Sequence, residues 1–267
     1  MSSFAWIDGR VSPLAEAAVP LGAEGLLRGD GAFETVGVWD GRPFRLDAHL
    51  ERLARSLRAL GLGAPDAPRL EQAAAELLAR FGDHDGMLRL SVLSGGTHLV
   101  TLAPQPDRPP IRVLSSRPAP WIRPLGSFGP AGAKSLSYAP NMAALRAAQA
   151  DGADDALLVS LEGWVLEGTT FAVLWVRDGV LRTPAVDLGI VDSISRQALL
   201  DAARGEGIAV EEGRWPLEEL AEAGEVLVCS SVRPCTAVRR VDGWTFDGPA
   251  AVCERIGPLL EAARRAR

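Results

Sequence analysis

The chain has 267 residues, of which 47% are hydrophobic, so it is long enough for one large or two modest domains with buried cores. Its net charge of −6 argues against a nucleic-acid-binding protein, and its 28 basic residues, one lysine and the rest arginines, are dispersed and form no polybasic membrane patch. The sequence shows no apolar run of membrane-spanning length, no C-x-x-C motif and no metal-ligand spacing among its histidines, which together predict a reduced, cytoplasmic protein without a metal site or membrane association.

The first part of the chain predicts a small α+β domain. Asp40-Gly41 is a strong hairpin signal, and Asp47 is placed to cap the helix that follows and ends at Gly61. Strands are expected at 4–7, 33–39, 42–46, 87–93 and 99–102, and helices between Asp47 and Gly61 and at 68–81.

A domain boundary is predicted where the composition changes. The segment 104–132 is rich in proline and glycine, and one apolar strand at 111–114 interrupts it. The sequence therefore predicts a small N-terminal domain at 1–116, a linker at 117–131 and a larger C-terminal domain at 132–267.

The second part of the chain is predicted to contain both helices and strands. A proline suits the first turn of the helix that begins at Pro140. Strands are expected at 156–160, 164–166, 171–176 and 225–229, a hairpin turn at Asp178-Gly179, and helices at 140–150, 195–204, 218–223 and 250–264.

The single lysine, Lys134, is a candidate for covalent chemistry. Arginine replaces lysine as a positive charge, but only a lysine amine can lose its proton and condense with a carbonyl group. The only tyrosine, Tyr138, stands four positions later and is suited to donate a hydrogen bond to a phenolic oxygen. The alternatives are a surface lysine and a tyrosine that packs in the core.

Further polar residues have one functional and one ordinary interpretation. Glu167 lies between apolar strand segments, where its carboxylate either holds a protonated pyridine nitrogen or ends an exposed hairpin. Arg52 either flanks the buried face of its helix or is solvated. Ser193 to Ser195 offer a helix N-terminus that suits a phosphate, as does any N-cap, and Ser230-Ser231 offer a second phosphate contact or a turn.

These residues together supply an amine, an acceptor for a pyridine N–H, a donor for a ring oxygen and a phosphate cradle. Pyridoxal 5′-phosphate needs all four groups. The sequence therefore predicts this cofactor, although none of the residues decides the matter alone.

The sequence also resembles the class IV pyridoxal-phosphate enzymes of fold type IV, which include branched-chain and D-amino-acid aminotransferases and 4-amino-4-deoxychorismate lyase. The resemblance covers nearly the whole chain in the right order. Its motifs are RGDGAFETV at 28–36, HLERL at 49–53, AKSLSYAPNMAALRAA at 133–148, GWVLEGTTFAVL at 163–174, GIVDSISRQAL at 189–199 and VCSSVRP at 228–234.

The resemblance implies a role for each matching residue. Lys134 would bond to the cofactor and shuttle a proton, Glu167 would hold the pyridine nitrogen, and Tyr138 would face the ring oxygen. Phosphate contacts would come from residues on both sides of the lysine, namely Arg52, Ile194, Ser195, Ser231 and the backbone of Val232, which stands where relatives have threonine. The resemblance further implies an α/β fold, with a small N-terminal α+β domain and a larger C-terminal domain as in D-amino-acid aminotransferases. It also implies a small-molecule amine substrate, a cofactor held between the two domains, and a homodimer.

Substrate-side residues favour the lyase, an enzyme of folate biosynthesis, over an aminotransferase. D-Amino-acid aminotransferases resemble one another in a T-R-G strand end whose arginine grips the substrate carboxylate, whereas this chain has Ser94 there, and they usually have tyrosine where it has Phe33. Phe33, Arg89 and Arg233 are predicted to contact substrate, the two arginines as anchors for its carboxylates. A class IV aminotransferase of branched-chain or D-amino acids is the alternative, and a cofactor-holding relative without turnover is the third hypothesis.

Overall fold

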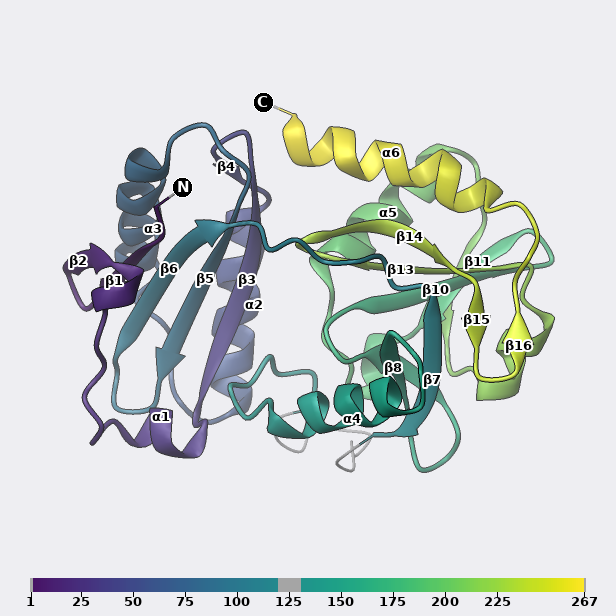
Figure 1. Cartoon of the computed structure of the whole chain (residues 1–267), viewed down its shortest axis with the longest axis horizontal. Coiled ribbons are helices and arrows are strands. Elements are labelled where there is room, and N and C mark those ends of the chain that lie inside the picture. Colours follow the sequence, from purple (N-terminus) through teal and green to yellow (C-terminus); the bar gives the residue numbers. More distant parts are fainter. Residues whose placement is uncertain (1, 120–130, 267) are drawn as a thin grey trace. The chain divides into compact units, whose positions relative to one another are not determined.

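The computed structural model describes residues 2–119 and 131–266, which divide into two compact units (Figure 1). The described residues within Met1–Asp107, Ala133–Tyr138 and Arg264–Arg267 form unit 1. Those within Arg108–Gly132 and Ala139–Ala263 form unit 2.

This division differs from the predicted domain boundaries, since residues 108–116 belong to unit 2 and residues 133–138 to unit 1. Strand β7 (Val113–Pro118) pairs in parallel with β8 (Asp155–Val159), so residues 108–116 belong to unit 2 and not to the N-terminal unit. Composition marks turns but does not reveal which sheet a strand joins. Residues 120–130 of the predicted linker lie outside the described residues.

Unit 1 is a six-stranded antiparallel sheet with helices on one face. The strand order is β2-β1-β6-β5-β3-β4. The strands are β1 (Phe4–Ile7), β2 (Arg10–Pro13), β3 (Gly31–Trp39), β4 (Arg42–Pro43), β5 (Gly86–Leu93) and β6 (His98–Pro104), and the helices are η1 (Leu14–Glu16), α1 (Glu24–Arg28), α2 (Leu46–Ala59) and α3 (Ala67–Phe81).

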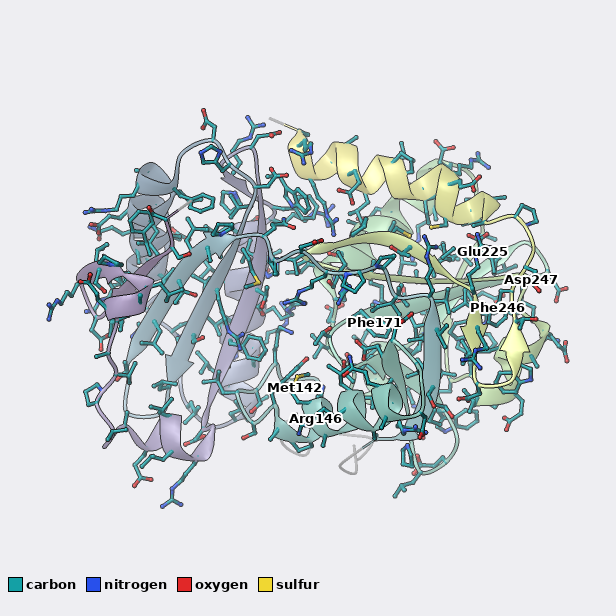
Figure 2. The ribbon with its side chains drawn as sticks, viewed as in Figure 1. Met142, Arg146, Phe171, Glu225, Phe246 and Asp247 are labelled. Carbon is teal, nitrogen blue, oxygen red and sulfur yellow. The ribbon has the colours of Figure 1, made fainter. Side chains whose placement is uncertain are left out.

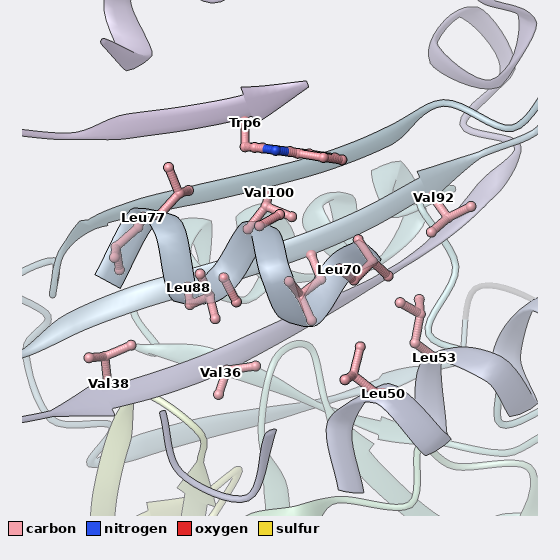
Figure 3. Close-up of a cluster of buried hydrophobic side chains, with 14 of the residues drawn as sticks. Trp6, Val36, Val38, Leu50, Leu53, Leu70, Leu77, Leu88, Val92 and Val100 are labelled. Carbon is pink, nitrogen blue, oxygen red and sulfur yellow. The ribbon is translucent and has the colours of Figure 1, made fainter. Parts of the chain in front are cut away.

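The core of unit 1 lies between this sheet and the apolar faces of α2 and α3 (Figure 3). Leu53 and Leu77 come from the two helices and meet Val36 and Val100 from the strands, all four fully buried. Burial of an apolar side chain of this size contributes about 1.5–3 kcal/mol, so this layer holds the helices against the sheet.

The start of α2 differs from the prediction. Arg45, in the left-handed region at φ 51°, precedes the helix, and Asp47 lies inside its first turn and is not the cap. The expected strand at 42–46 is correspondingly short, because the chain turns into the helix directly after β4. The acidic side chain still favours the helix electrostatically, since the N-terminus carries partial positive charge.

Unit 2 contains two five-stranded sheets. Their strand orders are β12-β11-β10-β13-β14 and β16-β15-β7-β8-β9. Besides β7 and β8, the elements are α4 (Ala139–Ala150), β9 (Val165–Gly168), β10 (Ala172–Arg177), β11 (Val180–Pro184), η2 (Val186–Leu188), α5 (Ile194–Gly205), β12 (Val210–Gly213), η3 (Leu217–Glu222), β13 (Glu225–Ser230), β14 (Arg233–Val238), β15 (Arg240–Val241), β16 (Trp244–Thr245) and α6 (Ala251–Arg265).

Two buried side chains tie the elements of unit 2 together (Figure 2). Phe171 belongs to the core and covers Gly168 so closely that a Cβ there would overlap its ring. The Glu225 carboxylate accepts the N–H groups of Val252 (3.0 Å) and Cys253 (2.7 Å) in the first turn of α6. A carboxylate at a helix N-terminus satisfies N–H groups that have no acceptor within the helix.

Among the helices that the structure describes, none combines the length and apolar character of a membrane span.

Candidate active site

The backbone of Lys134 is fixed from both sides in unit 1. Its N–H donates to Ser56 Oγ on α2 at 3.0 Å, and its carbonyl accepts the N–H of Phe33 on β3 at 2.9 Å. An antiparallel bridge between Ala32 and Ser135 extends the pairing. The lysine segment thus occupies the edge of β3 at the strand's beginning, while β4 pairs with its end.

Two basic side chains and two aromatic rings gather beside this segment. Phe33 lies 4.2 Å from the Arg89 guanidinium carbon and 4.6 Å from Lys134 Nζ, measured to the ring centroid. Tyr138 packs edge-on against Phe33 at 5.4 Å between centroids, and Lys134 Nζ is 5.8 Å from its ring. Arg89 and Lys134 therefore both lie against the ring of Phe33. Two of the predicted substrate contacts, Phe33 and Arg89, are thus next to the predicted covalent residue.

Arg89 is a half-buried cation of this cluster. Within the described part of the chain, no Asp or Glu side chain lies in ion-pair distance of it. Burial lowers the pKa of its guanidinium, and the nearby Tyr138 opposes that change. A partly desolvated arginine of this kind favours binding an anion.

Arg52 is buried and is not the solvated arginine that helical periodicity allows. Its Nε donates to Glu34 Oε1 at 2.8 Å and its Nη2 to Glu34 Oε2 at 2.6 Å. His49 Nδ1 lies 2.7 Å from the same Oε2. Strand β3 supplies Glu34 and helix α2 supplies the other two residues, so this buried charged group is formed where the two elements pack.

The contacts in this group change the protonation of Glu34 and of His49. Burial by itself would raise the pKa of Glu34, but the charge and hydrogen bonds of Arg52 and the hydrogen bond of His49 outweigh it and lower the pKa from 4.5 to about 2. Burial lowers the pKa of His49, its bond to Glu34 opposes this, and the charges of Arg52 and Lys134 lower the pKa further. Glu34 is therefore ionised and His49 neutral near pH 7.

This protonation predicts an acid-sensitive contribution to stability. Because the pKa of Glu34 is lower in the folded protein than in the unfolded chain, the ionised carboxylate stabilises the fold at pH values above 4.5. This stabilisation is lost as the pH falls toward 2. The loss should be on the order of 3 kcal/mol in the free energy of unfolding, measured by urea denaturation across this pH range. His49, which takes up its proton more readily when unfolded, acts in the same direction below its ordinary pKa of 6.5.

Glu34→Gln should remove most of this pH dependence and also lower stability at pH 7, because Arg52 would lose its counter-charge. Glu225→Gln is the matched control, since burial raises the pKa of that carboxyl and its removal cannot flatten an acid-side loss. An equally steep acid-side decline in wild type and Glu34→Gln would contradict the assignment.

Unit 2 holds the predicted acceptor for a pyridine nitrogen, and it is buried. Glu167 lies in β9 with 9% of its surface exposed, and its Oε2 accepts the N–H of Val191 at 3.1 Å. Gly168 follows it beneath the Phe171 ring, which explains why glycine is needed directly after the glutamate. The exposed hairpin-end interpretation of Glu167 is therefore excluded.

The predicted phosphate cradle of unit 2 lies at the start of α5. Ser193 is the N-cap, and its side chain accepts the N–H of Arg196 at 3.3 Å. Ile194 and Ser195 form the buried first turn. The hydrogen bond from Val191 to Glu167 brings this helix start next to the predicted pyridine acceptor within the same unit.

The remaining predicted contacts lie between β13 and β14, where Ser231 and Val232 form the connection and Arg233 begins β14. Arg233 Nη1 donates to the Pro109 carbonyl at 2.7 Å. Burial and Arg108 lower the pKa of Arg233, while the carboxylates of Asp155 and Asp154 raise it. Because carboxylates already face Arg233, Arg89 is the better candidate for a substrate anchor.

Sequence reasoning did not identify Glu34 and His49 as part of this site. Glu34 stands in a strand row with Ala32, Val36 and Val38, all three in the core, and His49 lies beside the apolar stripe of α2. A charged residue in an otherwise apolar row needs a buried partner, and this was the available signal. Over the ranges 2–119 and 131–266, His, Cys, Asp and Glu side chains form no group that could hold a metal ion.

Some known proteins are similar to this chain both in sequence and in fold. Residues 31–241 match the family described as Amino-transferase class IV. The chain is 34% identical, over 89% of its length and 90% of the relative's, to a bifunctional aminodeoxychorismate lyase / D-amino acid transaminase of Mycobacterium tuberculosis.

Two solved structures extend the likeness to nearly the whole chain. One is a fold IV transaminase from Curtobacterium pusillum, with a TM-score of 0.87, 33% identity, and coverage of 95% of this chain and 91% of the other. The second is a hypothetical aminotransferase from Mycobacterium tuberculosis in its PLP-bound form, with a TM-score of 0.86, 30% identity and coverage of 98% of both chains.

Proposed function

The chain belongs to the class IV aminotransferase family, and on this premise we propose that it is a 4-amino-4-deoxychorismate lyase, which releases 4-aminobenzoate and pyruvate. Enzymes of this family, whose fold is type IV, depend on pyridoxal 5′-phosphate. The observation that carries the proposal is Arg89, a half-buried cation on the same aromatic ring as Lys134 Nζ. It suits a substrate whose carboxylate must be held beside the reacting amine.

The residues of each unit fit the cofactor chemically. In unit 1, Lys134 offers an amine on a fixed backbone and Arg52 a buried guanidinium. In unit 2, Glu167 offers a buried carboxylate and α5 a helix N-terminus. Pyridoxal 5′-phosphate supplies an aldehyde that condenses with amines and a ring that stabilises a carbanion.

Each of the protein's own site residues would have a distinct role. Lys134 Nζ would hold the aldehyde end of the cofactor and would act as the base that takes up and returns a proton of the substrate. Glu167 keeps a proton on the pyridine nitrogen. Arg52, Ile194, Ser195, Ser231 and the backbone of Val232 bind the phosphate, and Tyr138 donates to the ring oxygen.

One sequence feature favours the lyase over a D-amino-acid aminotransferase, and the name of one relative includes the lyase activity. Ser94 stands where D-amino-acid aminotransferases have the arginine that holds the substrate carboxylate, and the relative 34% identical to this chain is named for lyase activity. The same relative is named for D-amino acid transaminase activity as well. Amino transfer from D-amino acids is therefore the second candidate function.

Incubation of the holoenzyme with 4-amino-4-deoxychorismate tests the proposal, and release of 4-aminobenzoate and pyruvate in equal amounts is expected. A parallel incubation with D- or branched-chain amino acids and a 2-oxo acid measures amino transfer. Amino transfer without pyruvate release would identify an aminotransferase, and cofactor absorbance without reaction in either assay would identify a non-catalytic relative.

Replacing Arg89 should weaken substrate binding selectively. In Arg89→Gln, the KM for the carboxylate substrate is expected to rise about tenfold or more, because a charged hydrogen bond is lost, while cofactor affinity stays unchanged. Steady-state kinetics and cofactor titration measure the two. Arg69→Gln is the matched control, since Arg69 also lies over an aromatic ring in unit 1, that of Trp6 at 5.3 Å. An unchanged KM in Arg89→Gln would remove Arg89 from the substrate site.

We also propose that the protein is a cytoplasmic homodimer, as its resemblance to the family implies. Light scattering of the purified holoenzyme after gel filtration measures its mass in solution, and twice the chain mass is expected. A monomer that is active would contradict the dimer.

A further inference from the structure

We propose that Glu34 and His49 are positioning residues that fix the guanidinium of Arg52 in the orientation that binds the phosphate of the cofactor. The inference rests on the proposed function, in which Arg52 contacts that phosphate. It assigns a role to two residues that touch neither the substrate nor the reacting atoms.

Glu34 holds Arg52 along one defined edge. The carboxylate accepts from Nε and Nη2, so it engages the guanidinium side-on with two parallel hydrogen bonds. Such a fork fixes the plane of the guanidinium, and the edge formed by Nη1 and Nη2 then points in one direction. A phosphate binds to arginine most strongly through two N–H groups in a fixed fork, so this orientation matters for affinity.

His49 in turn fixes the carboxylate. Glu34 is ionised and has no proton to donate, so the hydrogen of the 2.7 Å contact lies on His49 Nδ1 and is donated to Oε2. Oε2 therefore receives one bond from Nη2 of Arg52 and one from His49. The imidazole restrains the carboxyl group about its last torsion and, through it, the arginine.

Packing alone does not account for these residues. Glu34 is fully buried and pairs with Leu90 of the neighbouring strand β5, in a row whose neighbouring side chains are apolar. Apolar residues of similar volume commonly replace buried ion pairs without loss of stability. In addition, His49 Nε2 is buried without a hydrogen-bond partner among the described residues, a feature that a leucine at this position would avoid.

One face of α2 connects this group to the lysine. His49, Arg52 and Ser56 follow at spacings of three and four, so they lie on the same side of the helix. Ser56 accepts the N–H of Lys134. Helix α2 therefore positions both Arg52 and the backbone of Lys134. A reorientation of the Arg52 side chain would alter its proposed phosphate contact and would leave the hydrogen bond between Ser56 and Lys134 unchanged.

The test measures the contribution of the phosphate to affinity separately from that of the rest of the cofactor. Pyridoxal and pyridoxal 5′-phosphate carry the same aldehyde and ring, so the ratio of their dissociation constants reports on phosphate binding alone. Apo-protein is titrated with each compound and the absorbance of the bound chromophore is followed. Wild type is expected to prefer the phosphorylated compound strongly.

His49→Leu should reduce this preference by about tenfold, because the donor to Glu34 is lost. His49→Asn should restore it to within about threefold of wild type, because an asparagine amide donates from nearly the place of Nδ1. His98→Leu is the matched control, a buried histidine of the same unit whose Nδ1 faces the Gly96 carbonyl, and it should leave the ratio unchanged. Thermal unfolding of each apo-protein shows whether the variant is folded.

The double variant His49→Leu/Arg52→Ala should show no further loss beyond Arg52→Ala, because the histidine acts through the arginine. An unchanged ratio in folded His49→Leu and Glu34→Gln overturns the inference and leaves the proposed function intact. If wild type does not distinguish the two compounds, or binds neither, the proposed function fails and the inference fails with it. A purely structural role would lower affinity for both compounds equally and would also overturn it.

Discussion

Lys134→Arg should abolish turnover, with a loss of about four orders of magnitude or more. The arginine keeps the positive charge but stays protonated, so it neither bonds to the aldehyde nor moves the substrate proton. The backbone bonds from Lys134 to Ser56 and Phe33 do not involve its side chain, so the variant should fold normally. The absorption spectrum and substrate turnover measure the effect.

The presence of a single lysine makes this experiment unusually clear. Borohydride should fix the cofactor to the wild-type chain at Lys134, and peptide mass spectrometry should find it nowhere else on a lysine, because the chain has no other. The double variant Lys134→Arg/Arg28→Lys is the matched control. It moves the lysine to a position with 73% side-chain exposure, beside Glu24, and should restore neither the adduct nor turnover. An active Lys134→Arg enzyme would disprove the proposed covalent role.

Glu167→Gln is expected to slow turnover by about two orders of magnitude. A glutamine is nearly isosteric and can still accept the N–H of Val191, but it carries no negative charge to keep the pyridine nitrogen protonated. Loss of a charged hydrogen bond of about 1.5–3 kcal/mol corresponds to roughly ten- to a hundredfold or more in rate. Rapid mixing with amine substrate measures proton removal directly, and cofactor affinity should change much less than the rate.

Glu225→Gln serves as the matched control for this effect. Glu225 is likewise a buried glutamate of unit 2, but it caps α6 through the N–H groups of Val252 and Cys253. Its replacement should lower stability without altering the rate of proton removal. If Glu167→Gln and Glu225→Gln slow the reaction equally, the pyridine role of Glu167 is wrong.

Much of the fold follows from local signals. The strands at 4–7, 33–39 and 87–93 and the helix at 68–81 were predicted within two residues, because their alternation or 3.6-residue period is strong. Two other segments lie within two residues of their predicted positions but differ from the prediction in helix type or in the capping residue. The helix expected at 218–223 is the 3-10 helix η3, and α2 begins before its predicted cap, since a positive φ at Arg45 is not visible in the sequence.

The candidate site shows more clearly which features local sequence signals predict and which they do not. The sequence by itself made Lys134, Glu167 and the start of α5 candidates for the site, because an amine, a carboxylate between apolar strands and an N-cap are recognisable from their immediate neighbours. The family matches agree with that chemistry. These are properties of short segments, so no knowledge of distant contacts was needed.

Only the tertiary structure decided which charges are buried together. Arg52 meets Glu34 from 18 residues earlier in the chain, and the N–H of Lys134 reaches Ser56 over 78 positions. Protonation depends on desolvation and on the charges within a few ångströms, and both are fixed by how β3 packs against α2. The candidate reactive groups can therefore be predicted from the sequence. The burial and the charged partners of Arg52 arise only when strand β3 packs against helix α2.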